Sequence, residues 1–301
     1  MKVSKIIKFI SPISCSSFKD YDIETIKSIN DLSFNFNSLG WCSDGNIEIL
    51  KSLKGGTVLI SQNTENELTS RNIDIHFNKI IVDNPRKSFA EILREFFIEK
   101  VEYGKVHTSS VIDASVNFDL SKVVIGPNVV IEKNVILGSF VIIEANTVLK
   151  AGTIIHDNVK IGSNCTIGGV GFGYEPNDNG VYELIPHIGN VILKEFVEIG
   201  NNVCIDRAVI GSTILEKEVK IDNLVHIAHG VHIESNSLII AHAMIAGSVK
   251  IGKNTWVAPC SAIKQKVSIG DNVIIGLGSV VLKDVQNNEV VVGVPAKNII
   301  K

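Results

Sequence analysis

The sequence lacks a strong excess of charge of either sign. Its 301 residues include 29 lysines and arginines against 32 aspartates and glutamates, which gives a net charge of −3, and the basic residues form no cluster. A protein that binds nucleic acid needs a positively charged surface to neutralise phosphates. The charge balance therefore argues against a nucleic-acid partner.

Paired cysteines are also missing. The chain has an odd number of cysteines, scattered and without a CxxC pair: Cys15, Cys42, Cys165, Cys204 and Cys260. Disulfide frameworks and structural metal sites both need cysteines at regular spacings. We therefore expect reduced thiols, no metal, no tightly bound cofactor and a cytoplasmic protein.

Long apolar runs are absent as well, so we expect no membrane span. The first fifteen residues, MKVSKIIKFISPISC, faintly resemble a lipoprotein signal. Lys8 and Pro12 interrupt this segment, and its apolar run is too short for a signal core. A first β-strand is our expectation here.

What the sequence does contain is a period of six residues. One register is aliphatic at every sixth position: Ile221, Ile227, Ile233, Ile239, Ile245, Ile251, Val257, Ile263, Ile269, Ile275 and Val281. An earlier register behaves in the same way: Ile125, Ile131, Leu137, Ile143, Leu149, Ile155, Ile161 and Ile167. This period fits neither a 3.6-residue helix nor a flat strand, but it is typical of hexapeptide β-helices.

The period predicts a mainly β fold, a left-handed parallel β-helix over residues 101–285. Each aliphatic residue of the period should point inward and pack on its copies in neighbouring coils of about eighteen residues. Glycine often follows it, as in Ile125-Gly126 and Ile161-Gly162, where a side chain would clash.

The first 100 residues do not keep the period and predict a small α/β domain. Residues 55–61 and 78–84 have the pattern of strands, and residues 84–97 have the apolar face of a helix. Asn84 followed by Pro85 suits a helix start, and Ser88 with Glu91 suggests a capping box. Residues 286–301 are expected to form a short C-terminal tail.

The period breaks over residues 168–190, where Phe172, Tyr174 and Tyr182 stand among turn residues. A long excursion from a rigid scaffold is usually functional or disordered. We therefore expect either a surface flap or the lid of a ligand site, in which Phe172 and Tyr174 would contact substrate.

Three histidines interrupt the aliphatic pattern within seven residues. His229 comes two residues after Ile227, close to an expected corner, where a side chain can leave the solenoid. His226 and His232 each precede an inward residue, so they should point outward from different flat sides. His242 lies near a corner of the next coil and is a candidate substrate contact.

A set of motifs carries a family resemblance. GFGY, IPHIGNVI, VEIGNNVCIDRAVIGSTI, IDNLVHIAHGV and IAGSVKIG follow one another in that order. The chain resembles the UDP-3-O-acylglucosamine N-acyltransferases of lipid A biosynthesis, strongly over about 101–285 and weakly over the first 100 residues. The six-residue period specifies only the fold, whereas the combination of IDR, IDN and IAH is more specific.

The resemblance implies an N-acyltransferase that moves an acyl group from a thioester to the amine of a nucleotide-activated amino sugar. It implies a homotrimer with active sites between neighbouring β-helices. It places the catalytic histidine on His229, the preceding Asp-Asn pair on Asp222 and Asn223, and a backbone N–H donor on Gly247. A neutral imidazole can take the proton of an attacking amine, and an N–H group can stabilise the oxyanion.

Two departures from the family leave the donor open. Lys266 stands where the family carries a second histidine, and the chain ends in VVVGVPAKNIIK, where the family continues into helices. That ending is similar to short-chain sugar acetyltransferases of the same fold. Lys264 and Lys266 are among several polar outward residues of the late coils. We therefore expect a short acyl-CoA donor rather than an acyl carrier protein. The acceptor is expected to belong to surface-glycan, O-antigen or lipid A synthesis. The alternative is the lipid A enzyme itself with a carrier-protein donor.

The nucleotide site is expected in the first domain. Trp41 lies near the place where the family stacks an aromatic ring on uracil, and Asn84 and Arg86 lie at a helix start that could hold phosphate. Whether the nucleotide is UDP or dTDP stays open.

Two other classes of function remain. Clustered histidines on this fold could bind zinc, as in γ-type carbonic anhydrases, but His226 and His232 should diverge, whereas zinc requires converging ligands. A regular solenoid could also be a non-catalytic scaffold, against which the IAH motif and the resemblance of the first domain both argue.

Overall fold

Two compact units make up the chain, Met1–Val101 and Glu102–Lys301. The computed structural model describes residues 1–15 and 19–299. No helix in those ranges is both long enough and apolar enough to cross a membrane. The two units are described separately below.

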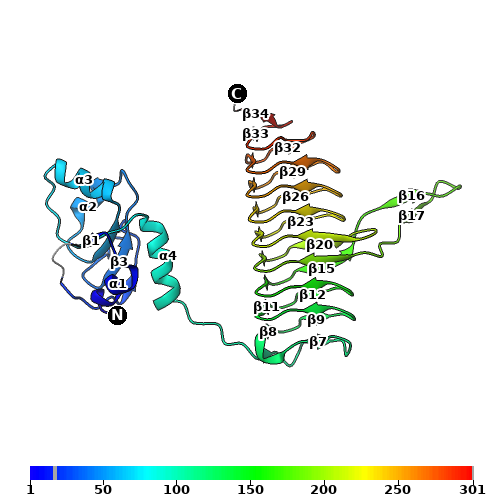
Figure 1. Cartoon of the computed structure of the whole chain (residues 1–301), viewed down its shortest axis with the longest axis horizontal. Coiled ribbons are helices and arrows are strands. Elements are labelled where there is room, and N and C mark those ends of the chain that lie inside the picture. The colour runs from blue at the N-terminus through cyan, green and yellow to red at the C-terminus, as the bar shows by residue number, and fades with distance from the viewer. Residues whose placement is uncertain (16–18, 300–301) are drawn as a thin grey trace. The chain divides into compact units, whose positions relative to one another are not determined.

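The first unit is a five-stranded sheet with helices (Figure 1). Its strand order is β1-β5-β4-β3-β2, parallel except for β1 against β5. The strands are β1 (Ser14–Cys15), β2 (Thr25–Ile26), β3 (Ser38–Trp41), β4 (Thr57–Ile60) and β5 (Asn78–Ile81). The helices are α1 (Val3–Ile10), α2 (Ile47–Ser52), α3 (Gln62–Ser70) and α4 (Pro85–Phe96). The strands and the helix predicted from residues 55–97 are confirmed as β4, β5 and α4.

Two local predictions for this unit are wrong. The N-terminal segment forms helix α1 and not a strand, because Val3, Ile6, Ile7 and Ile10 have helical spacing and pack into the core. The capping box proposed at Ser88 does not form, since α4 already starts three residues earlier. Its N-cap is Asn84, whose side chain accepts a hydrogen bond from the Lys87 N–H at 3.0 Å.

The second unit is the predicted parallel β-helix, with three faces that stack coil on coil (Figure 1). Ile221 pairs with Ile239, and Ile239 with Val257, so successive coils are eighteen residues apart. The inward aliphatic residues of the two registers are almost completely buried and form one continuous core. The left-handed hexapeptide β-helix expected from the sequence is therefore confirmed.

We number the faces in the order in which the chain visits them. The first face holds β6 (Lys105–Val106), β8 (Val123–Ile125), β11 (Val141–Ile143), β14 (Lys160–Ile161), β19 (Glu198–Ile199), β22 (Lys220–Ile221), β25 (Leu238–Ile239), β28 (Trp256–Val257), β31 (Ile274–Ile275), β33 (Val290–Val292) and β34 (Lys297–Asn298). The second holds β7 (Val111–Ile112), β9 (Val130–Ile131), β12 (Val148–Leu149), β15 (Thr166–Val170), β20 (Cys204–Arg207), β23 (His226–Ile227), β26 (Met244–Ile245), β29 (Ala262–Ile263) and β32 (Val280–Val281). The third holds β10 (Ile136–Leu137), β13 (Ile154–Ile155), β18 (Asn190–Leu193), β21 (Ser212–Leu215), β24 (His232–Ile233), β27 (Lys250–Ile251) and β30 (Ser268–Ile269).

Irregular pieces mark both ends of the solenoid. A short 3₁₀ helix, η1 (Leu120–Lys122), precedes β8. The segment expected as a tail, 286–301, adds β33 and β34 to the first face in its described part, and β34 runs antiparallel to β33.

We call the turn between the first and second faces corner A, and the turn between the second and third faces corner B. Each corner contains a residue with a left-handed backbone, most often asparagine, such as Asn128, Asn146 and Asn164. Glycines that follow the inward residue serve a different purpose. A Cβ on Gly162 would lie 2.6 Å from the Gly200 oxygen of the next coil, so close stacking of corners requires glycine there.

The excursion at 171–189 leaves the solenoid at corner B. It forms an antiparallel hairpin of β16 (Tyr174–Pro176) and β17 (Tyr182–Leu184) that projects away from the coils (Figure 1). The chain then returns to the third face at β18. The bases of both hairpin arms lie beside the residues that build the candidate site.

Candidate functional site

His229 projects from corner B, between β23 and β24. The backbone of this corner is tied to the coils on both sides: the His229 oxygen accepts from the Ser248 N–H at 2.9 Å, and the Gly230 N–H donates to the Thr213 hydroxyl at 2.8 Å. Gly230 adopts a φ of 68°, which glycine tolerates without strain. The imidazole therefore leaves the solenoid from a rigid point.

Glycines of two other segments make room for the His229 ring. A Cβ on Gly247, one coil later at the same corner, would lie 2.7 Å from His229 Nε2. A Cβ on Gly171, at the base of the hairpin, would lie 3.1 Å from His229 Cβ. The ring fits only because both positions lack a side chain. The Gly247 N–H forms no hydrogen bond with any described residue.

A second imidazole packs against the first. The rings of His187 and His229 have centroids 5.4 Å apart and are nearly perpendicular, at 82°. His187 belongs to the returning arm of the hairpin and is buried, and its Nδ1 lies 2.7 Å from the Ile185 carbonyl oxygen. The predicted lid thus contributes a ring to the surroundings of His229.

A carboxylate completes the charged surroundings of His229. Asp206, in β20, has Oδ2 at 3.7 Å from His226 Nε2. Burial raises the pKa of Asp206, and the neighbouring imidazoles of His226, His229 and His187 oppose that rise. Burial, followed by the nearby His187, lowers the pKa of His229, and Asp206 opposes the shift. A lowered pKa keeps His229 neutral at neutral pH, the state in which an imidazole can accept a proton.

His226 and His232 point outward from the second and third faces, as predicted, and therefore diverge. His232 Nε2 lies 3.3 Å from Glu216, an outer-surface contact. In residues 1–15 and 19–299, no group of three histidine, cysteine, aspartate or glutamate side chains could hold a metal ion.

Asp222 and Asn223 lie at corner A, on the other side of the second face from His229. The Asn223 N–H donates to Asp222 Oδ1 at 2.7 Å, and Asn223 Oδ1 accepts from the Asn201 N–H at 2.7 Å. His242 is at the same corner one coil later, with an exposed side chain and a φ of 61°. Within one chain, the predicted polar contacts and the predicted base are therefore on different corners.

Phe172 and Tyr174 lie on the departing arm of the hairpin, with ring centroids 4.9 Å apart. Phe172 is 86% exposed, so its ring packs against little of the same chain. Lys264 and Lys266, the predicted donor contacts, are exposed at corner B one coil beyond Gly247, and the Lys266 N–H donates to the Gly247 oxygen at 2.9 Å. These residues lie along the same corner as His229.

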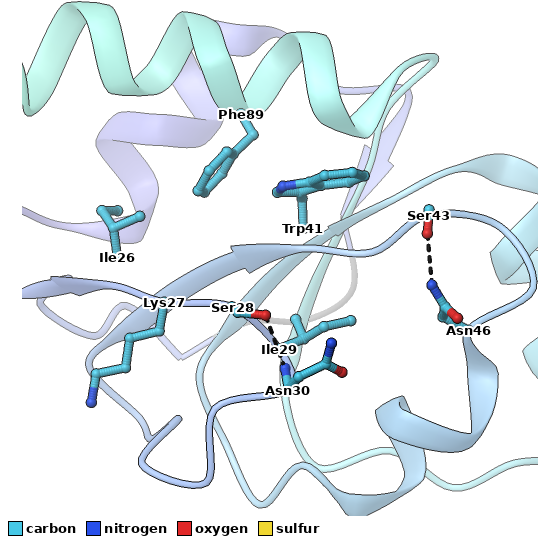
Figure 2. A pocket seen from close by; sticks show the side chains of 9 residues that line it. All are labelled: Ile26, Lys27, Ser28, Ile29, Asn30, Trp41, Ser43, Asn46 and Phe89. Atoms are coloured by element: carbon cyan, nitrogen blue, oxygen red, sulfur yellow. Dashed lines mark hydrogen bonds between the residues drawn. The ribbon is translucent and has the colours of Figure 1, made fainter. Parts of the chain in front are cut away.

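The residues predicted for the nucleotide do not come together. Trp41 lines a pocket of about 370 Å³ with Phe89 of α4 and polar groups that include Lys27, Ser43 and Asn46. Figure 2 shows the two rings side by side at this pocket. Asn84 lines a different pocket, and its side chain caps α4. Arg86 is exposed in the first turn of that helix.

Sequence reasoning missed His187 and Asp206. Both stand inside motifs that carried the family resemblance, IPHIGN and IDR, yet neither was singled out. A histidine at the end of an excursion beside a histidine-rich corner was the available signal for His187. For Asp206 the signal was a carboxylate directly after an inward residue, where glycine often stands.

Comparison with known proteins decides the family. The bacterial transferase hexapeptide model (six repeats) matches residues 134–169 and 248–283. A UDP-3-O-acylglucosamine N-acyltransferase of Campylobacter lari is 38% identical over 98% of this chain and 93% of the relative. A protein of the same name from Campylobacter jejuni is 36% identical, over 98% of this chain and 92% of the relative.

The chain belongs to the UDP-3-O-acylglucosamine N-acyltransferase family. It is therefore an acyltransferase of the hexapeptide-repeat class, as the sequence predicted.

Solved structures agree on the fold of the solenoid. LpxA of Acinetobacter baumannii superimposes with a TM-score of 0.58 and 24% identity, covering 64% of this chain and 72% of that one. A UDP-N-acetylglucosamine acyltransferase from Campylobacter jejuni gives a TM-score of 0.58 at 23% identity, covering 64% and 73%. At this level of identity, the likeness concerns the β-helix alone.

Proposed function

We propose that the protein transfers an acyl group from a thioester to the amine of a UDP-linked 3-O-acylglucosamine, with His229 as general base. The observation that carries this proposal is the partly buried imidazole of His229, held between Gly171 and Gly247 at corner B with a lowered pKa. The name shared by relatives that match nearly the whole chain supplies the substrate class.

The chemistry follows from the two groups at that corner. The amine nitrogen attacks the thioester carbon while His229 takes one of its protons, so that a C–N bond forms. The oxyanion that develops on the carbonyl oxygen accepts a hydrogen bond from the Gly247 N–H. Collapse of this intermediate breaks the C–S bond, and the thiolate leaves with the proton that His229 carried.

The nucleotide end of the acceptor is assigned to the Trp41 pocket. An indole and a phenyl ring offer stacking surfaces for a pyrimidine base, and Lys27 offers a positive charge for phosphate. Replacing Trp41 with alanine is expected to weaken UDP binding by about tenfold or more, measured by calorimetry, with kcat at saturating acceptor unchanged. UDP and dTDP binding to the unmodified protein, compared side by side, distinguishes the two nucleotides.

The donor is best judged from the outer surface of the late coils. The polar outward residues named from the sequence, such as Lys264 and Lys266, are exposed, but two faces also carry apolar rows that were not predicted. Leu238, Trp256 and Ile274 stack in register on the first face. Met244, Ala262 and Val280 do the same on the second. Each methylene that such a surface buries contributes about 0.8 kcal/mol, so these rows favour a long acyl chain over an acetyl group.

Lys264 and Lys266 then meet the anionic part of the donor, whether a phosphopantetheine on a carrier protein or CoA. A competition between acetyl-CoA and a 3-hydroxyacyl carrier protein, with UDP-3-O-acylglucosamine as acceptor, tests the donor. Mass spectrometry should find only the long-chain product. Efficient acetyl transfer would restore the short-chain donor that the sequence favoured.

The separation of corners A and B supports a homotrimer in which Asp222 and Asn223 of one subunit face His229 of another. Three-fold closure brings unlike surfaces of identical chains together. All five cysteines are free, which is compatible with the reducing cytoplasm, where we place the reaction. Light scattering that shows a stable, active monomer would contradict the shared site.

A further inference from the structure

His187 is held at the base of the hairpin by a hydrogen bond to its own arm. Its Nδ1 lies 2.7 Å from the Ile185 carbonyl oxygen. A carbonyl oxygen can only accept, so Nδ1 carries a proton and donates it in this bond. The ring is 8% exposed, and this hydrogen bond anchors it to the backbone of its own arm.

The Nε2 edge of His187 lies in a buried space bordered by glycines. A Cβ on Gly171 would lie 2.9 Å from this Nε2, and one on Gly173 would lie 3.3 Å from the adjacent Cε1. Nε2 is buried and has no hydrogen-bond partner among the described residues. The His187 ring is therefore held by its Nδ1 hydrogen bond and by packing, with no second polar contact at Nε2 among the described residues.

The position of this ring matters because it packs directly against the ring of His229. Gly171 and Gly247 border the His229 ring and offer no side chain. The edge-to-face packing of His187, at 5.4 Å and 82°, supplies a wall. The charged or titratable groups that face His229 are His187 from the hairpin and Asp206 from β20, and Asp206 also faces His226 from β23.

We propose that His187 is a positioning residue, whose ring packs edge to face on His229 and fixes the His229 ring over Gly247. The proposal rests on the proposed function, in which His229 is the base. It gives the excursion at 171–189 a role in catalysis, because the hairpin carries the His187 ring that packs against His229.

The test compares His187→Ala with His187→Phe. Removing the ring lets His229 rotate, and we expect kcat to fall by about 10–100-fold with the acceptor KM within about twofold. The acid limb of the kcat–pH profile should move to higher pH, because burial is the main cause of the low pKa of His229. His187→Phe, which keeps a flat ring, should recover at least about tenfold of the loss. His232→Ala on the third face is the matched control and should change kcat by less than about twofold.

A double variant shows whether His187 acts through His229 or affects catalysis independently of it. Adding His187→Ala to His229→Ala should cause no further loss, because a positioning residue has nothing left to position. Full additivity, wild-type turnover in His187→Ala, or a His187→Phe variant as slow as the alanine variant would each overturn the proposal. If His187→Ala loses the oligomer, His187→Leu fills the space without a flat ring and replaces it.

The outcomes for the two proposals are distinct. If His229→Ala itself retains wild-type turnover, the proposed general base is wrong whatever His187 does. If His229→Ala is inactive while His187→Ala is fully active with an unchanged pH profile, only the positioning role fails.

Discussion

Corners A and B flank the same face of the β-helix and both carry a histidine, but the two side chains differ in burial and in their neighbours. At corner B, His229 is partly buried between two glycines and packed against a second imidazole. At corner A, His242 is exposed on a left-handed corner residue, and the nearby Asp222 and Asn223 are bonded to backbone groups.

The difference teaches that burial, more than residue type, assigns the roles. A desolvated imidazole has a low pKa and a fixed direction, which suits proton transfer. An exposed imidazole can still donate or accept a hydrogen bond, which suits substrate contact. In the proposed function, corner B therefore provides the proton transfer and corner A provides contacts for the substrate from a neighbouring subunit.

The largest expected effect is at corner B. Replacing His229 with alanine should lower kcat by about 10²–10⁴-fold, the usual contribution of a general base, because in the proposed mechanism His229 takes the proton of the attacking amine. Steady-state turnover with UDP-3-O-acylglucosamine measures it, and UDP affinity should stay unchanged. Wild-type turnover in this variant would show that another residue is the base and that corner B is not the site of proton transfer.

Combining defects at the two corners tests whether one site uses both. His229→Ala and Asn223→Ala proteins, each strongly impaired, are mixed, unfolded and refolded together. If every site takes a base from one subunit and Asn223 from the next, about a quarter of the sites should be intact. Recovery of turnover toward that fraction supports the shared site, whereas a mixture no better than its parents would show that each chain works alone. Light scattering of Asn223→Ala controls for assembly.

Much of this comparison could be predicted from the sequence, because the β-helix repeats every eighteen residues. The period placed Ile227 inside, and His229, two residues later, had to fall at a corner. The same rule put His226 and His232 on diverging faces. The helix α4 followed from the spacing of Phe89, Ile92 and Phe96, which places them on one side.

The remainder depended on contacts that no period encodes. His187 reaches His229 only because the returning arm of the hairpin meets the solenoid beside corner B, an arrangement set by tertiary packing. The N-terminal helix was missed because Val3, Ile6 and Ile10 fit a short helix as well as an apolar strand, and burial against the sheet decided between them. Trp41 and Asn84 were expected together, but each lines its own pocket, since the side chain of Asn84 is used to cap α4.

A smaller effect is expected from filling the space beside the base. Gly247→Ala would place a Cβ 2.7 Å from His229 Nε2, so the ring must rotate away from its catalytic position. We expect kcat to fall by about 10–100-fold, the range in which a shift of about 1 Å weakens catalysis, with thermal unfolding close to that of the wild type. Gly169→Ala is the control, because its Cβ would meet ordinary contacts of 3.5 and 3.6 Å. Equal activity of the two variants would show that His229 tolerates displacement.

The smallest effect is expected from replacing the histidine of corner A, His242, with alanine. His242 is exposed and can offer a substrate one hydrogen bond, with a net contribution of about 0.5–1.5 kcal/mol. His242→Ala should therefore raise the acceptor KM by about 2–10-fold and leave kcat unchanged, because a lost contact that is equal in ground and transition states affects binding alone. The kcat–pH profile should also stay in place, in contrast to that of His187→Ala. A fall in kcat comparable to that of His229→Ala would instead make corner A a second centre of proton transfer, and the division between the two corners would be wrong.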